Sequence, residues 1–308
     1  MIDLTVIIVT WNARADIDRC LTSIHGAGTV CSMKTVVVDN NSGDGTADTI
    51  ARAFPWVELV RNAGNAGFAA ANNQAVKRCD SRYVLLLNPD TQVSPGAFDG
   101  LVQFMDARPT AWAAGPSMVN SDGSLQRTGV RFPTLWNIFV ESLFLDRMLP
   151  HSHVFGGHRE LYRDPTITRK VDYVQGSCLI ARREAITQVG GLDEEYFMYF
   201  EETDWCYRVS QAGGEVWYCP DVSVVHFGGG TTGHYDERRL VHYYASLILF
   251  YRKHHSLAGR AAVRLVIGCR AILRLLVWCA IAIARPGIRE SARSSARGYL
   301  RVLAGVFR

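Results

Sequence analysis

Residues 4–12 read LTVIIVTWN, an apolar and largely β-branched run that ends in polar residues. Further apolar runs follow at residues 35–38, 57–60 and 83–87, and the stretches between them carry apolar residues at helical spacing. Buried strands that alternate with helices are typical of a parallel sheet covered by helices on both faces. The first hundred residues therefore predict an α/β fold.

The composition excludes several other classes of protein. Of the 308 residues, 48% are hydrophobic and 20% are charged, so the chain is neither disordered nor fibrous. Its length suits about two folded units. The eight cysteines form no C-x-x-C pair, which predicts buried thiols rather than a zinc or disulfide framework. Neither a Walker loop nor G-x-G-x-x-G follows the first predicted strand, which argues against P-loop enzymes and Rossmann dehydrogenases.

Polar residues follow each of the four predicted strands. The clusters are Thr10–Asn12, Asp39–Ser42, Arg61–Asn62 and Asn88–Asp90. Such residues also make ordinary turns, but four clusters at one sheet edge favour a polar ligand, because open α/β sheets bind ligands at the carboxyl ends of their strands. Asp90 offers a hard carboxylate of the kind that Mg²⁺ or Mn²⁺ prefers.

The chain resembles the inverting glycosyltransferases of family 2. The motifs that carry the resemblance keep the family's order over residues 4–230: VIIVTWN (6–12), VVVDNNS (36–42), RNAGNAGFAAANN (61–73), LLLNPD (85–90), GSCLIARR (176–183), GGLDEEYFMYFEETDWCYR (190–208) and VVHFGGG (224–230). The fullest likeness is to bacterial rhamnosyltransferases, which includes the NPD form of the metal motif and GSLQRTGVRFP (123–133).

The resemblance implies the GT-A fold, a Rossmann-like mixed sheet that binds nucleotide-diphospho-sugars, followed here by C-terminal amphipathic helices. We expect a nucleotide-sugar-binding half at residues 1–110 and an acceptor-binding, catalytic half at residues 111–230. Residues 231–308 are expected to form a basic, helical, membrane-associating region.

The resemblance also implies a donor site. Its expected nucleotide-binding residues are Thr10, Asn12, Asp39, Asn65, Gly67, Phe68 and Asn88. In the family, the counterpart of Asp39 faces the pyrimidine ring, and a carboxylate can accept from N3–H of uracil or thymine. Asp90 resembles the metal-binding acid of the D-x-D-type motif, whose first acid is Asn88 here. His226 resembles the histidine that reaches the metal or the diphosphate, and the implied cofactor is Mg²⁺ or Mn²⁺.

Three acids match the family's catalytic motif: Glu201, Glu202 and Asp204. The catalytic base maps to Glu202, a glutamate where aspartate is commoner. Acids at a helix start are also a common structural device, and for Asp204 that role is at least as well supported as catalysis. Thr203 is predicted to cap a helix that runs to Gln211.

The implied reaction is a metal-dependent transfer with inversion, in which Glu202 takes the proton of an acceptor hydroxyl. The favoured sugar is L-rhamnose from dTDP-rhamnose, and the expected acceptor is a glycolipid or a cell-surface polysaccharide. A UDP donor of galactofuranose or N-acetylglucosamine remains an alternative, as does a non-catalytic, membrane-bound sugar-nucleotide sensor. A sugar nucleotidyltransferase is disfavoured, because no glycine-rich basic loop follows the first predicted strand.

The C-terminal segment is strongly basic. Residues 256–308 hold ten arginines and a single acid, Glu290. Wound as a helix, this segment places Arg260, Arg264, Arg270 and Arg274 in one arc, with Leu265, Ile272, Leu276 and Ile283 opposite. Spanning a bilayer is disfavoured, since three buried arginines cost roughly 7.5–10 kcal/mol and the aliphatic residues recover about 3–7 kcal/mol.

We therefore expect a peripheral protein on the cytoplasmic face of the bacterial membrane, bound to anionic lipid. The arginines expected at this surface are Arg264, Arg270, Arg274, Arg289 and Arg293. The alternative is that the C-terminal helices pack on the catalytic domain. Nucleic acid is not an expected partner, because residues 1–255 are acidic and contain no nucleic-acid-binding motif.

Overall fold

The computed structural model describes residues 2–126, 128–158, 160, 162–228, 237–284, 287 and 289–306, without the side chain of Arg289. They form two compact units. The sheet unit comprises the described residues of 1–132, 164–197 and 201–231, and the helical unit those of 133–163, 198–200 and 232–308. Segment 133–163, which precedes the second half of the sheet unit in sequence, therefore belongs with the C-terminal helices.

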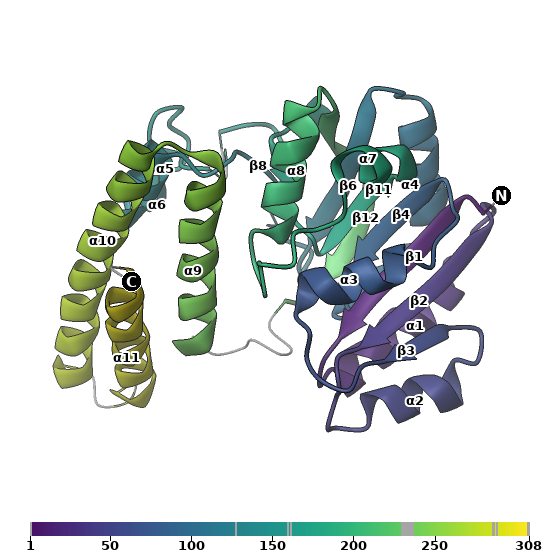
Figure 1. Cartoon of the computed structure of the whole chain (residues 1–308), viewed down its shortest axis with the longest axis horizontal. Coiled ribbons are helices and arrows are strands. Elements are labelled where there is room, and N and C mark those ends of the chain that lie inside the picture. The colour runs from purple at the N-terminus through teal and green to yellow at the C-terminus, as the bar shows by residue number, and fades with distance from the viewer. Residues whose placement is uncertain are drawn as a thin grey trace. The chain divides into compact units, whose positions relative to one another are not determined.

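A ten-stranded mixed sheet forms the centre of the sheet unit (Figure 1). Its strands are β1 (Leu4–Thr10), β2 (Met33–Asp39), β3 (Glu58–Arg61), β4 (Tyr83–Leu87), β5 (Thr91–Val93), β6 (Ala111–Val119), β7 (Leu125–Gln126), β9 (Arg169–Lys170), β11 (Cys178–Arg182) and β12 (Glu215–His226). The main order is β3-β2-β1-β4-β11-β6-β12-β5. The first four strands are parallel and β11 runs antiparallel to β4, so the predicted mixed sheet is confirmed.

Helices cover both faces of this sheet. They are α1 (Arg14–His25), α2 (Thr46–Ala53), α3 (Phe68–Val76), α4 (Ala97–Asp106), α7 (Arg183–Val189) and α8 (Glu201–Gln211). Two short strands, β8 (Gly129–Val130) and β10 (Tyr173–Val174), pair separately. Every residue of β1 is buried, because apolar side chains pack on both faces of the strand. The predicted alternation of strands and helices is therefore confirmed.

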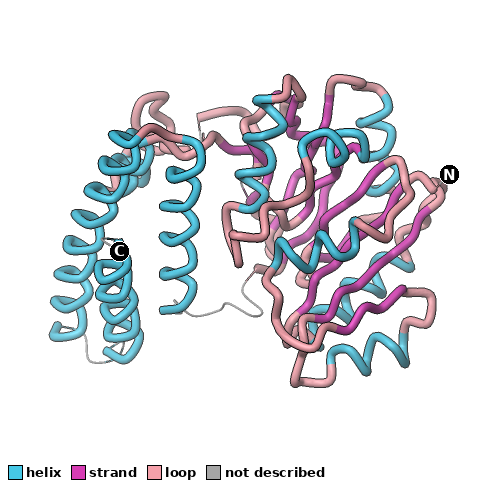
Figure 2. The backbone as a smooth tube through the Cα atoms, in the orientation of Figure 1, coloured by secondary structure: helices cyan, strands magenta, loops and turns pink. Residues whose placement is uncertain are grey.

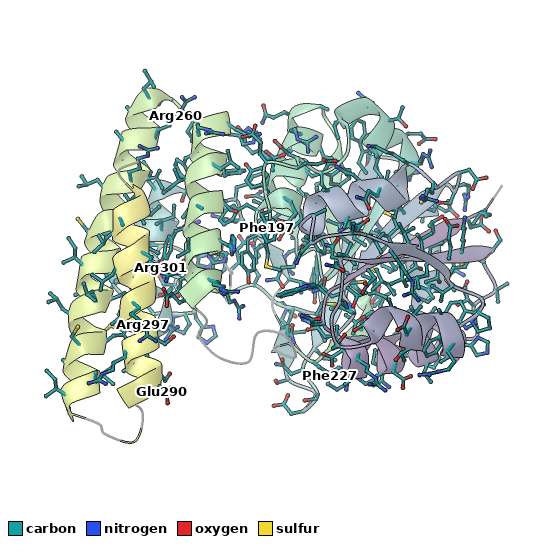
Figure 3. The ribbon with its side chains drawn as sticks, turned by 60° about the horizontal axis from the view of Figure 1, so that its bottom comes forward. Phe197, Phe227, Arg260, Glu290, Arg297 and Arg301 are labelled. Atoms are coloured by element: carbon teal, nitrogen blue, oxygen red, sulfur yellow. The ribbon has the colours of Figure 1, made fainter. Side chains whose placement is uncertain are left out.

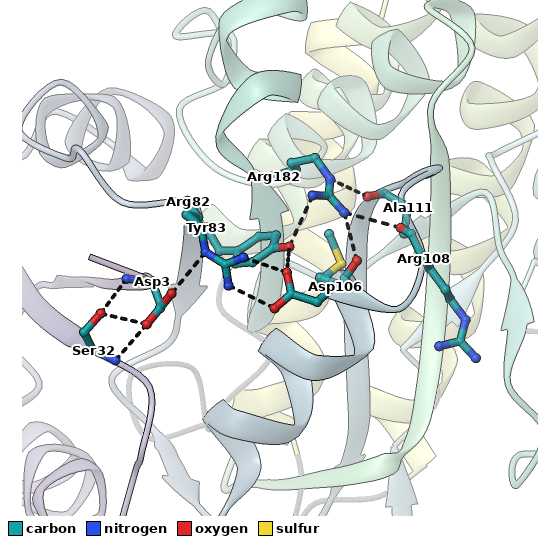
Figure 4. A network of polar contacts seen from close by, with 9 residues as sticks. Asp3, Ser32, Arg82, Tyr83, Asp106, Arg108, Ala111 and Arg182 are labelled. Atoms are coloured by element: carbon teal, nitrogen blue, oxygen red, sulfur yellow. Dashed lines mark hydrogen bonds and ion pairs between the residues drawn. The ribbon is translucent and has the colours of Figure 1, made fainter. Parts of the chain in front are cut away.

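A network of polar side chains lies at the amino end of β4 (Figure 4). Arg82 contacts Asp3 at 3.0 Å and pairs through both terminal nitrogens with Asp106 at 2.8 and 2.9 Å. The Tyr83 hydroxyl donates to Asp106 at 2.6 Å, and Arg182 donates to that hydroxyl at 3.2 Å. These contacts join β4, β11, α4 and the residue before β1 at the edge opposite to the polar strand ends.

The helical unit contains α5 (Leu135–Ser142), α6 (Leu145–Met148), α9 (Glu237–His254), α10 (Leu257–Ala284) and α11 (Arg289–Val306), which Figure 2 shows in cyan. The Tyr251 hydroxyl donates to the carbonyl of Pro133 at 3.1 Å, which ties α9 to the start of segment 133–163. Cys269 and Cys279 are exposed on α10, so the prediction of buried thiols is wrong for these two cysteines. The predicted C-terminal helices are present.

Candidate active site

The carboxyl edge of the parallel strands brings the first candidate residues together. Thr10 is the register partner of Asp39, because both are the last residues of paired parallel strands. Asp39 is 3% exposed, and its carboxylate accepts hydrogen bonds from the Ser42 amide at 3.0 Å and the Ser42 hydroxyl at 2.6 Å. The Asn12 amide donates to the same Ser42 hydroxyl at 2.8 Å. A carboxylate offers about four acceptor positions, so Asp39 retains capacity for a ligand.

The loop before α3 is held in one conformation. The side-chain oxygen of Asn65 accepts from the Gly67 amide at 3.0 Å, and the Phe68 amide donates to the carbonyl of Phe197 at 3.0 Å. Gly67 has φ +85°, and a Cβ at this position would lie 2.7 Å from the Phe197 carbonyl oxygen. Only glycine fits there. The predicted nucleotide loop is thus held against Phe197, which lies four residues before Glu201, the first acid of the motif.

Asp90 and His226 come together through strand pairing. β5 and β12 are antiparallel and place His226 opposite Thr91. His226 Nε2 lies 3.3 Å from Asp90 Oδ1, and both side chains are 15% exposed. Asn88, the residue in place of the family's first acid, is half-buried, and its amide donates to the carbonyl of Ser177 at 3.0 Å.

Gln126 determines the tautomer of neutral His226. The amide nitrogen of Gln126 donates to the His226 carbonyl at 2.7 Å and to the Asn120 side-chain oxygen at 2.6 Å. Because a backbone carbonyl can only accept, this orientation leaves the Gln126 oxygen facing His226 Nδ1 at 2.8 Å. Nδ1 therefore carries the hydrogen, and the lone pair of Nε2 points at the Asp90 carboxylate.

Two acceptors that face each other fit a bound cation. Asp90 supplies a hard oxygen and His226 a nitrogen, which are both metal ligands. The described residues contain no group of three or more His, Cys, Asp or Glu side chains that could hold a metal. This pair suits a divalent ion whose remaining ligands are substrate phosphates and water.

The acidic motif occupies the first turn of α8, which begins at Glu201. The helix thus starts two residues before the predicted cap, Thr203. The two residues before it, Tyr199 and Phe200, have φ of 67° and 68°. Such left-handed conformations cost about 1–3 kcal/mol each in non-glycine residues and cluster at functional sites. The helix boundary is therefore set by strained backbone rather than by a threonine cap.

Glu201 and Glu202 are carboxyl groups with perturbed acidity. Burial, reinforced by the charge of Glu202, raises the pKa of Glu201 well above its usual range. Burial also raises the pKa of Glu202, and backbone N–H groups, among them those of Thr203 and Gly176, oppose this shift. A Cβ on Gly176 would lie 3.7 Å from the Glu202 Cβ and 3.6 Å from the Phe68 ring, so Glu202 lies beside the predicted nucleotide loop.

Asp204 has structural partners. It is 1% exposed, and it accepts from Arg208 Nε at 2.8 Å and from the Tyr196 hydroxyl at 3.4 Å. Arg208 also donates to the carbonyls of Val189 at 2.6 Å and Gly191 at 2.8 Å. The Asp204 carboxylate therefore holds α8 against the loop before the acidic motif.

Several buried polar atoms at this edge have no hydrogen-bond partner among the described residues. They are Thr10 Oγ1, Ser177 Oγ, Glu201 Oε2 and Glu202 Oε2. Buried polar atoms in folded proteins are normally paired, and unpaired ones call for a functional explanation. The sequence alone predicts no role for Ser177, Gly176, Gln126 or Arg208, although the quoted motifs contain all four. Their side-chain types gave no signal of what they contact.

The predicted membrane arginines have different surroundings within the helical unit. Arg270 lies 3.9 Å from Glu141, and the Arg274 guanidinium stacks on the Phe144 ring at 3.5 Å from its centre. Arg264 is half-buried and Arg293 is exposed, whereas the side chain of Arg289 lies outside the described residues. Figure 3 labels Arg260 on α10 and Arg297 and Arg301 on α11, of which the last two pair with Glu237.

Comparisons with known proteins agree with this architecture. Residues 5–189 match the family model described as glycosyl transferase family 2. The chain is 29% identical to N-acetylglucosaminyl-diphospho-decaprenol L-rhamnosyltransferase of Mycobacterium tuberculosis, with 98% of each chain covered. It is 26% identical to rhamnosyltransferase WbbL of Escherichia coli, over 66% of this chain and 74% of that one.

A solved structure shares the fold. Mannosyltransferase PcManGT from Pyrobaculum calidifontis, in complex with GDP-Man and Mn²⁺, superimposes with a TM-score of 0.57 at 17% identity. The match covers 98% of this chain and 86% of that one. The expected GT-A fold is confirmed.

Proposed function

The chain belongs to glycosyl transferase family 2, and from this membership we propose that it transfers L-rhamnose from dTDP-rhamnose, with inversion, to a lipid-linked saccharide. The glycosyltransferase activity follows from the family. The rhamnose donor is supported by the names of two relatives, from M. tuberculosis and E. coli. The lipid-linked acceptor is supported by the diphospho-decaprenol in the name of the first.

Glu202 is the proposed catalytic base. The surroundings of its carboxylate are the observation that supports the mechanism. One of its carboxylate oxygens has no hydrogen-bond partner among the described residues, and the side chain lies beside Phe68 and Gly176. Its raised pKa makes the carboxylate a stronger base than an exposed glutamate. Glu202 takes the proton of the acceptor hydroxyl as that oxygen attacks the anomeric carbon, and the nucleoside diphosphate leaves from the opposite side.

Asp90 and His226 are the proposed ligands of a divalent ion at the donor diphosphate. When bound, that ion supplies charge stabilisation for the leaving phosphates. The imidazole nitrogen favours Mn²⁺ over Mg²⁺, because Mg²⁺ prefers oxygen ligands. Asp39 is proposed to accept from N3–H of the thymine ring, and Thr10, Asn12, Asn65, Gly67, Phe68 and Asn88 are proposed to line the same donor site.

A test starts with nucleotide binding to the full chain by calorimetry. We expect dTDP to bind more tightly than UDP, GDP or ADP, and more tightly with Mn²⁺ than without it. Tighter binding of UDP would be consistent with the same enzyme class. It would indicate UDP-galactofuranose or UDP-N-acetylglucosamine as the donor instead. Incubation with dTDP-rhamnose and an N-acetylglucosaminyl-diphospho-polyprenol should then yield a product of opposite anomeric configuration. Nucleotide binding without transfer or donor hydrolysis would favour the alternative of a non-catalytic sensor.

The proposed location is the cytoplasmic face of the membrane, where nucleotide-sugars are available. The lipid-linked acceptor named for the M. tuberculosis relative supports membrane association. Of the described helices, α10 alone is long and apolar enough to cross a membrane by length and composition, and 17% of its most apolar window is buried. We propose peripheral attachment through the helical unit.

A further inference from the structure

The two sides of α10 have opposite environments within the helical unit. At 100° per residue the apolar arc lies opposite Arg270 and Arg274, whereas Arg260 and Arg264 border the same groove as Leu265. Arg270 faces Glu141 of α5, and Arg274 faces Phe144, the residue before α6. The apolar arc is bare: the exposed fractions are 63% for Leu265, 53% for Ile272, 63% for Leu276 and 80% for Ile283. The outward side of the helix is therefore apolar, while Val263, Ile267 and Ala271 pack inward beside the arginines.

This exposed arc carries no charge along several helical turns. Cys269 and Cys279 are exposed on the same helix, and they are also uncharged. A soluble surface normally interrupts such a stripe with polar side chains, and large bare apolar patches mark interaction sites. The stripe is therefore a surface that is covered in the functional state.

A groove with three guanidinium groups lies where α9 and α10 meet. It has a volume of about 510 Å³, and Arg252, Arg260 and Arg264 line it together with the apolar side chains of Ile248, Leu257 and Leu265. None of the described residues that line it is acidic. The groove is therefore cationic at its polar positions and apolar elsewhere, which complements a phosphate group attached to hydrocarbon.

We propose that this surface docks the protein on anionic phospholipid, with lipid phosphates in the groove of Arg252, Arg260 and Arg264 and the stripe of Leu265, Ile272, Leu276 and Ile283 in the acyl region. Leu265 belongs to both features, so the groove and the stripe adjoin. A helix that lies in the interface with its apolar side down has this arrangement. This proposal deepens the proposed function, because it names the surface that binds the membrane. It rests on the proposed function only in taking the acceptor to be a lipid.

The packing of the arginine arc favours lying on the membrane over crossing it. A crossing α10 would carry Arg270, its partner Glu141 and the Arg274 guanidinium into the hydrocarbon layer, where charged groups are strongly disfavoured. A helix that lies flat leaves these groups on the protein side. The predicted headgroup contact of Arg270 and Arg274 is thus replaced in our proposal by contact through Arg252, Arg260 and Arg264.

The test is co-sedimentation of the full chain with vesicles of 30% phosphatidylglycerol and 70% phosphatidylcholine, beside vesicles of phosphatidylcholine alone. We expect binding to the anionic vesicles at least tenfold tighter. The variant Arg252→Gln/Arg260→Gln/Arg264→Gln should lose that preference, and Ile272→Glu/Leu276→Glu should reduce binding to both vesicles at least tenfold. The matched control, Arg52→Gln/Lys77→Gln/Arg78→Gln, removes the same charge from exposed positions of the sheet unit and should bind as the unaltered protein does.

Two results would overturn the proposal. One is undiminished binding of either groove or stripe variant to anionic vesicles. The other is a concentration-dependent dimer in analytical ultracentrifugation that Ile272→Glu/Leu276→Glu dissolves, with no vesicle binding by the unaltered protein, because the stripe would then cover a second copy. Nucleotide binding in the same preparations shows that the sheet unit is folded. Since vesicle binding needs neither donor nor acceptor, its outcome is independent of the proposed sugar transfer.

Discussion

His226 Nε2 lies 3.3 Å from Asp90 Oδ1, and Gln126 determines that this nitrogen presents a lone pair rather than a hydrogen when the imidazole is neutral. The pair is joined across 136 positions of sequence by the antiparallel pairing of β5 and β12. Metal-binding histidines are commonly oriented by such a hydrogen bond at the other ring nitrogen. The relationship makes Gln126 a positioning residue for the proposed metal site.

Replacing Gln126 by leucine should weaken Mn²⁺-dependent binding of dTDP by about 10–100-fold, because loss of an orienting partner of a metal ligand has effects of that size. Binding of dTDP without metal should change little. Calorimetry measures both, and nitrogen NMR of labelled histidine reports the His226 tautomer. Asn120→Ala is the matched control, since it removes a partner of Gln126 and leaves both contacts to His226. Equal Mn²⁺ dependence in Gln126→Leu and the unaltered protein would exclude the positioning role.

The variant Glu202→Gln should reduce transfer by about 10²–10⁴-fold while dTDP binding is preserved, because general-base assistance contributes that much. The raised pKa of Glu202 has a further consequence. A base works when ionised, so kcat/KM should fall as the pH drops through this pKa, at a pH above the ordinary value of 4.5. An acid limb near or below pH 4.5, or near-normal turnover by Glu202→Gln, would remove Glu202 from this role.

Glu201 should make stability fall as the pH rises. Its pKa is raised in the folded state, so the folded protein binds this proton more tightly than the unfolded chain does. The contribution of Glu201 to stability is therefore most favourable below its unfolded pKa. It declines from about pH 4.5 up through the folded pKa. Glu201→Gln should thus raise Tm at pH 8 and change it little at pH 4. Calorimetric melting of both proteins decides this, and an equal shift at both pH values would contradict it.

The sequence predicted those features that depend on local periodicity. Alternating buried strands and helices gave the parallel half of the sheet, and the strand-end clusters placed Asp39 and Asp90 at one edge. Long-range pairings have no such signal: the contact of His226 with Asp90 depends on a strand more than a hundred residues away. The roles expected for His226 and Glu202 came from the family resemblance alone.

Two local features also escaped prediction for physical reasons. α8 begins at Glu201 because Tyr199 and Phe200 adopt positive φ, and neither residue type favours that conformation. Helical spacing on α10 separated arginines from apolar residues correctly. It did not reveal which side packs, because that choice depends on partners such as Glu141 and Phe144 in a distant segment.

Arg208→Met should destabilise the protein by about 3–5 kcal/mol, the usual effect of leaving one member of a buried ion pair without its partner. Asp204 is 1% exposed, and Arg208 Nε lies 2.8 Å from it. Denaturant unfolding measures the change. The double variant Asp204→Leu/Arg208→Met should recover part of the loss, since it removes the isolated charge. If Arg208→Met lowers transfer with no loss of stability, Asp204 has a catalytic rather than a structural role.

Gly67→Ala should weaken dTDP binding at least tenfold, because the added Cβ would meet the Phe197 carbonyl at 2.7 Å and the residue has φ +85°. The backbone of Phe197 cannot move aside as a flexible side chain can, so the loop that carries Asn65 and Phe68 must move. Gly64→Ala is the control in the same loop, since nothing lies within 4 Å of its Cβ. Calorimetry with dTDP compares the two variants. Equal affinities would show that the loop tolerates displacement, and that Gly67 serves the fold rather than the donor site.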